Sequence, residues 1–111
     1  MKYLLDIYQD DEEGMKKILK GIYAQFEILP MQLTKYTDSI DYKSLINLCH
    51  VMSANAMMIG SYELKSKFLE LEAGLIDHVF NPEEVSERVE EIQKLLPPAI
   101  ESINIYLNYY D

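Results

Sequence analysis

Apolar residues recur at intervals of three and four along most of the chain, the spacing of one face of an α-helix. The longest such run follows Asp10 and Asp11, two candidate N-caps, and begins with two acids that suit the first turn of a helix. The run contains Met15, Ile18, Leu19, Ile22, Phe26, Leu29, Leu33 and Tyr36. Pro30 interrupts the run without ending it, so we expect a kinked helix rather than two separate ones.

Residues 38–41 form a predicted turn, and the pattern on both sides of this helix indicates further helices. Met1 to Gln9 contains Leu4, Leu5, Ile7 and Tyr8 and predicts a short first helix. Asp41 is a good N-cap for a third helix, and Gly60 suits its C-terminal end because glycine readily adopts the left-handed conformation there. A fourth helix is expected from about Ser61 to the neighbourhood of Val79. Because the connection at Gly60 is tight, we expect the third and fourth helices to be antiparallel neighbours.

A last helix is predicted to begin at Asn81, where a capping residue is followed by Pro82 and two acids. Pro97 and Pro98 are expected to bend or split it. The chain shows no internal repeat and no linker-like segment, and 111 residues suit one domain with one core. The sequence therefore predicts an all-α fold over residues 1–111, an antiparallel four-helix bundle with a short additional N-terminal helix.

Charge and cysteine content narrow the possible functions. Nineteen acids against ten bases give a formal net charge of −9, which repels a phosphate backbone and argues against nucleic-acid binding. The single cysteine cannot form an intramolecular disulfide, and no apolar run is long enough to cross a membrane. Because the first residues also lack the build of a signal peptide, we expect a cytoplasmic domain without membrane contact. The two histidines lie far apart and without Glu-x-x-His motifs, so no metal site is predicted.

His50 lies opposite the apolar stripe of the third helix. At about 100° per residue, it falls about 160° from Met52, the centre of that stripe. Small and apolar residues surround it where charged ones would be usual on a solvated face, which suits docking by another protein. The outward face comprises Lys43, Ile46, Asn47, Ser53, Ala54, Met57 and Ser61.

The third and fourth predicted helices resemble the histidine-containing phosphotransfer (HPt) domain family. The family pattern runs from an aspartate through histidine, lysine and glycine to a glycine-ended turn and a Leu-Glu pair on the next helix. The corresponding residues here are Asp41, His50, Ser53, Ala54, Gly60, Leu64, Leu71 and Glu72. Their spacing agrees without a gap, the stretch FEILP that ends at Pro30 also resembles the family's second helix, and nearly the whole chain fits.

The resemblance implies a phosphoryl carrier rather than a self-sufficient enzyme. A phospho-aspartate of a response-regulator receiver domain would donate its phosphoryl group to His50, which would pass it to another receiver in a multistep phosphorelay. Glu72 would orient the imidazole by accepting a hydrogen bond from one ring N–H, and Ser53 would offer the phosphoryl group a hydrogen bond. Lys43 is expected to contact the receiver. The carrier needs no cofactor of its own, and magnesium is expected on the partner receiver.

Other interpretations of the sequence remain open. Ser53 and Ala54 stand where the family usually has lysine and glycine. The alternative hypothesis is therefore a receiver-binding or scaffolding module with weak or no phosphotransfer. An unrelated helical adaptor is a third possibility. His78 is expected to be a capping or incidental residue and Cys49 a core residue, while Met57 and Met58 fit either a partner surface or the core. The sequence does not identify the cognate kinase, which the resemblance allows to be a hybrid sensor kinase, nor the direction of transfer or the oligomeric state.

Overall fold

Four α-helices make up the part of the chain that the computed structural model describes, which is residues 11–110, with side chains up to residue 108. They are α2 (Glu12–Asp38), α3 (Tyr42–Met58), α4 (Tyr62–Ile76) and α5 (Pro82–Tyr110). No strand occurs in this range, which confirms the all-α class there. The short helix expected over Met1 to Gln9 lies outside the described residues.

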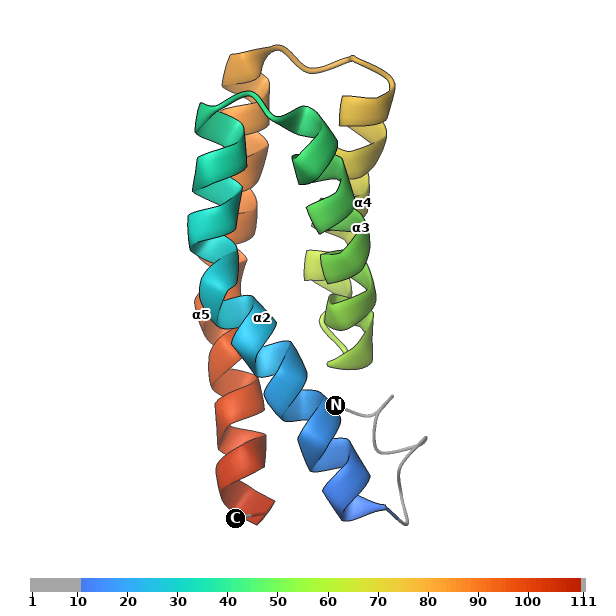
Figure 1. Cartoon of the computed structure of the whole chain (residues 1–111), viewed down its shortest axis with the longest axis vertical. Coiled ribbons are helices and arrows are strands. Elements are labelled where there is room, and N and C mark those ends of the chain that lie inside the picture. The colour runs from blue at the N-terminus through green and yellow to red at the C-terminus, as the bar shows by residue number, and fades with distance from the viewer. Residues whose placement is uncertain (1–10, 111) are drawn as a thin grey trace.

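The helices lie lengthwise along the molecule. The two long helices, α2 and α5, lie side by side, and the two shorter ones, α3 and α4, form a second pair beside them (Figure 1). Contacts are most extensive between α3 and α4 and between α2 and α5. The α2 stripe predicted from the sequence supplies six buried side chains: Met15, Leu19, Ile22, Phe26, Leu29 and Leu33. Helices α3, α4 and α5 add apolar side chains to the same cluster, so the four helices share one hydrophobic core.

Side-chain caps start three of the helices, as the sequence predicts. The Asp11 carboxylate accepts a hydrogen bond from the Gly14 amide at 2.9 Å. Asp41 accepts from both the amide and the hydroxyl of Ser44, at 3.2 and 2.7 Å. These two bonds, the hydroxyl bond first, lower the pKa of the Asp41 carboxyl below its ordinary value. The carboxylate therefore adds stability at neutral pH, and this contribution is lost as the pH falls through the lowered pKa.

Asn81 caps α5 reciprocally. Its side-chain oxygen accepts from the Glu84 amide at 2.8 Å, and the Glu84 carboxylate accepts from the Asn81 amide at 3.3 Å. Two backbone amides at the N-terminal end of α5 thereby find hydrogen-bond acceptors. The helix start predicted at Asn81 is confirmed.

Three helices end in the same hydrogen-bonded turn, in which one residue adopts a left-handed conformation. At the end of α3 that residue is Gly60, with φ of 77°, as the sequence predicts. The Ser61 amide donates to the Ala56 carbonyl and the Gly60 amide to the Met57 carbonyl, which is the pattern of a Schellman motif. Ile40 and His78 take the equivalent places after α2 and α4, with φ of 54° and 56°. Helix α4 consequently ends at Ile76, earlier than the neighbourhood of Val79 that the sequence predicts.

Replacing Ile40 with glycine should stabilise the protein. A β-branched side chain at φ 54° is strained, and this one is 60% exposed, so little packing is lost with it. We expect Ile40→Gly to raise the free energy of unfolding by about 1 kcal/mol, measured by urea denaturation. Gly60→Ala, which creates the same strain at the end of α3, should lower it by a similar amount. Unchanged or reduced stability in Ile40→Gly would contradict the strained conformation.

The prolines inside α2 and α5 leave both helices continuous. Helix α2 continues through Pro30 and changes direction in its middle third, as predicted (Figure 1). Helix α5 is continuous through Pro97 and Pro98, so the double proline does not split it. The buried side chains of α5 lie on both sides of the prolines, and tertiary packing of that stripe holds the helix together despite the missing amides.

Candidate functional site

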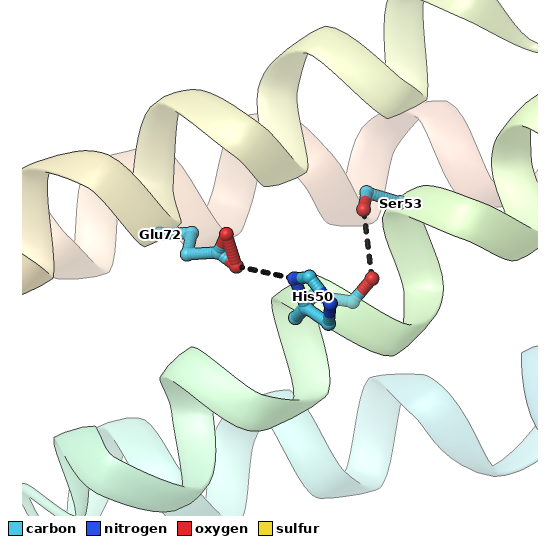
Figure 2. Close-up of polar contacts among 3 residues, drawn as sticks. All are labelled: His50, Ser53 and Glu72. Atoms are coloured by element: carbon cyan, nitrogen blue, oxygen red, sulfur yellow. Dashed lines mark hydrogen bonds and ion pairs between the residues drawn. The ribbon is translucent and has the colours of Figure 1, made fainter.

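His50 projects from α3 into solvent and contacts one carboxylate. Its side chain is 77% exposed, and its Nδ1 lies 3.2 Å from Oε2 of Glu72 (Figure 2). The exposure agrees with the prediction from the helical angle. The structure thus brings together the two residues to which the sequence analysis assigned the acceptor and orienting roles.

Glu72 fixes one of the two ring nitrogens. It lies on α4 with its side chain only 16% exposed, and it can reach His50 because α3 and α4 pack along each other. When the ring is neutral, Nδ1–H donates to the carboxylate and Nε2 keeps its lone pair. When the ring is protonated, the same contact is an ion pair. In both states Glu72 restricts the orientation of the imidazole.

The outward orientation expected for Ser53 is wrong. Its side chain does not face outward: the residue is buried, with 7% exposure. Its hydroxyl donates a hydrogen bond to the His50 carbonyl oxygen at 2.7 Å (Figure 2). Such a bond back to the preceding turn is the usual way in which a helical serine satisfies its hydroxyl. Ser53 therefore supports the α3 backbone below His50 and does not present a group to the solvent side of the ring.

The other residues of the predicted docking face differ in exposure. Lys43, Asn47 and Ala54 are exposed. Ile46, Met57 and Ser61 are partly buried, and Ile46 packs against the core, as does the neighbouring Met58. The accessible face around His50 is consequently smaller than the sequence predicts, and its docking role stays a prediction.

A groove between α2 and α3 adjoins this face and was not identified from the sequence. It encloses about 450 Å³ and is lined by uncharged residues of both helices. Ile28 of α2 and Val51 of α3 line it and are about half exposed. Val51 directly follows His50 in the sequence. It lines a groove with Ile28 only because α2 and α3 pack together, and helical periodicity within one segment cannot show this packing.

Cys49, beside His50 in the sequence, is not a second nucleophile. Its side chain is fully buried, as the sequence analysis expected. Burial, and secondarily the charge of Glu72, raises the pKa of the thiol to about 12. The thiol is therefore protonated at neutral pH, and the reactive thiolate is essentially absent.

His78 is separate from the site. It is exposed and takes the left-handed position after α4, so it belongs to the end of a helix, one of the two roles expected for it. Among residues 11–110 no three histidine, cysteine or acidic side chains cluster as metal ligands would. Within the same range no helix combines the length and apolarity needed to cross a bilayer.

Comparisons of the chain with protein-family models, curated proteins and solved structures found no match. The function is therefore inferred from the geometry of the residues themselves. The central feature is an exposed imidazole that has one nitrogen held by a carboxylate, while its other nitrogen makes no hydrogen bond to any of the described residues. This arrangement favours chemistry at Nε2.

Proposed function

We propose that the chain is a histidine phosphotransfer domain of the HPt type, and that its helices form the antiparallel four-helix bundle of that family. The observation that carries the proposal is the exposed His50 ring held through Nδ1 by Glu72. The short connections after α2 and α3 and the paired packing of the helices support the bundle. The cap at Asp41 and the glycine turn at Gly60 support the family spacing.

Phosphoryl transfer to His50 needs only the groups already in place on this chain and a partner that carries an acyl phosphate. The Nε2 lone pair attacks phosphorus in line, and a N–P bond forms as the P–O bond to the receiver aspartate breaks. The aspartate leaves as a carboxylate with the electron pair. The ring becomes positively charged and keeps its proton on Nδ1. This N–H group donates a charge-assisted hydrogen bond to the Glu72 carboxylate. The reverse reaction delivers the phosphoryl group to a second receiver.

Glu72 is expected to act as a positioning residue for this transfer. Glu72→Ala should lower the rate of His50 phosphorylation about tenfold, since hydrogen bonds to charged groups contribute about 1.5–3 kcal/mol and 1.4 kcal/mol corresponds to a factor of ten. Glu72→Gln, which keeps an acceptor without the charge, should lose less. The rates are measured at saturating receiver, so that a change in binding is separated from a change in transfer. Equal rates in Glu72→Ala and the wild type would contradict the positioning role.

The proposed partners are receiver domains, with magnesium bound by the receiver and a hybrid sensor kinase as one possible source of phosphoryl groups. The structure also favours one alternative. Because the Ser53 hydroxyl is buried and engaged by the His50 carbonyl, it offers the phosphoryl group nothing. A scaffold that binds receivers with weak or no transfer therefore remains the second candidate.

Mixing the chain with phosphorylated receiver domains tests the proposal. The expected product is a phosphoryl adduct that is labile in acid and stable in alkali, located on the His50 peptide by mass spectrometry. Binding of a receiver without any label would overturn the carrier function and leave the scaffold. If no receiver of a broad panel binds the chain or labels it, both candidates are contradicted.

A further inference from the structure

A small polar pocket lies between the C-terminal end of α2 and the first half of α5. Its volume is about 190 Å³, and none of its lining residues belongs to α3 or α4. It is therefore separate from the site proposed for phosphoryl transfer. Its polar lining residues are Thr34, Thr37, Asp38, Ser86, Glu90 and Gln93.

The Thr37 hydroxyl is the group of this pocket that needs an explanation. Its Oγ1 is buried and forms no hydrogen bond with any described residue. The hydroxyls of Ser39 and Ser53, by contrast, donate to carbonyl oxygens of the preceding turn. A buried polar atom without a partner costs free energy, so folded proteins normally satisfy it with a protein group, a water or an ion. The Thr37 hydroxyl therefore indicates a ligand in the pocket.

The groups that remain for such a ligand are oxygens, and two of them carry charge. Gln93 uses its Nε2 donor on α2, 3.4 Å from the Pro30 carbonyl oxygen and 3.2 Å from Oγ1 of Thr34. Neither Asp38 nor Glu90 forms an ion pair within the described part of the chain. No lysine or arginine lines the pocket. The pocket thus has two carboxylates that no cation of the described helices neutralises.

We propose that this pocket binds a hard divalent cation, of the class of calcium and magnesium. These ions prefer carboxylate, amide and hydroxyl oxygens together with waters, whereas zinc prefers nitrogen and sulfur ligands, which are absent from this lining. The pocket has room for an ion that keeps several waters, since a water takes about 30 Å³. The bound ion ties the last turn of α2 to α5, and the inference does not depend on the proposed transfer function.

The helix dipoles also favour a cation at this position. Asp38 is the last residue of α2, where the dipole is negative. The lining residues of α5 begin at Ser86, beyond the first turn of that helix, where the opposite dipole has faded. Lys35 and Lys94 each lie one turn from a pocket carboxylate, but Lys35 lies over the Tyr36 ring and neither pairs with that carboxylate.

Thermal unfolding of the full chain tests the inference, with calcium chloride and magnesium chloride as the probes. The chain is first treated with EDTA, and sodium chloride keeps the ionic strength constant. We expect at least one of the two ions, at about 10 mM, to raise the Tm of the wild type by about 5 °C, as for a Kd of about 1 mM. Asp38→Asn and Glu90→Gln should each lose most of this shift. Thr37→Val, which keeps the shape but not the hydroxyl, should lose about half, and Thr37→Ser should keep it.

Glu87→Gln is the matched control. Glu87 is exposed one turn before Glu90 and does not line the pocket, so this variant should keep the full shift. The Tm of each variant in EDTA shows that it is folded. No shift in the wild type beyond that of sodium chloride would overturn the inference. Equal shifts in Glu87→Gln, Asp38→Asn and Glu90→Gln would overturn it too, because the ions would then only screen the net charge of −9.

Paramagnetic manganese locates the ion independently of stability, because it takes the same oxygen ligands. In amide NMR spectra it should broaden the signals of residues 34–38 and 86–93 first. Thr37→Val folds in the same shape and should need more manganese for the same broadening. Broadening that begins elsewhere on the chain would contradict the site.

Discussion

The His50→Gln variant is expected to take up no phosphoryl label from a receiver that labels the wild-type chain. Glutamine retains hydrogen-bonding capacity, but its amide nitrogen has no available lone pair for attack on phosphorus. The 77% exposure of the ring means that its removal costs little packing, so the variant should fold and bind the receiver as before. The measurement pairs a labelling assay with a binding assay and a denaturation curve on the same preparation.

His78→Asn is the matched control for this experiment. His78 is the other histidine in the described helices and their connections, and it is also exposed, so labelling at any accessible imidazole would involve it too. Asparagine tolerates the left-handed conformation at φ 56°, which makes the substitution mild. We expect full labelling of His78→Asn. Label that persists in His50→Gln and disappears in His78→Asn would place the acceptor in the turn after α4 instead of on α3 and contradict the site.

Helix starts and buried stripes were predictable because they are local properties of the sequence. Asp11, Asp41 and Asn81 each cap a helix through contacts three residues away. The end of α4 was less predictable because His78, rather than a glycine, takes the left-handed position there. The continuity of α5 was also not predictable from its two prolines, since it depends on packing against the other helices.

The candidate site also combines features that are local to one helix with features that depend on packing between helices. The exposure of His50 follows from its angle on a single helix, and this was predicted. Ser53 lies about 100° from Met52 on that helix, on the flank of the stripe, and a flank is buried or exposed according to what packs beside it. Since α4 packs closely along α3, Ser53 is buried. The Ile28–Val51 groove was missed for the same reason, because it requires α2 beside α3.

Gly74→Ala is expected to destabilise the protein, although alanine is the better helix former. Gly74 is buried near the end of α4, where the Phe80 ring packs directly over it. A Cβ at this position would lie 2.0 Å from Cε2 of Phe80, so the ring must leave. The ring would then also lose the Arg88 guanidinium, which lies 5.2 Å from its centroid. We expect the free energy of unfolding to fall by about 2 kcal/mol in urea denaturation, more than the helix propensity of alanine restores.

Gly21→Ala is the opposite case and separates packing from propensity. Gly21 lies on the exposed side of α2, and a Cβ there would meet nothing within 4 Å. We expect this variant to gain about 0.5–1 kcal/mol from helix propensity alone. In a double-mutant cycle, Gly74→Ala should cost much less when Phe80 is already alanine, because the clash is then absent. If both glycine substitutions stabilise the chain equally, Phe80 does not pack on Gly74, and the turn that closes α4 against α5 is held in another way.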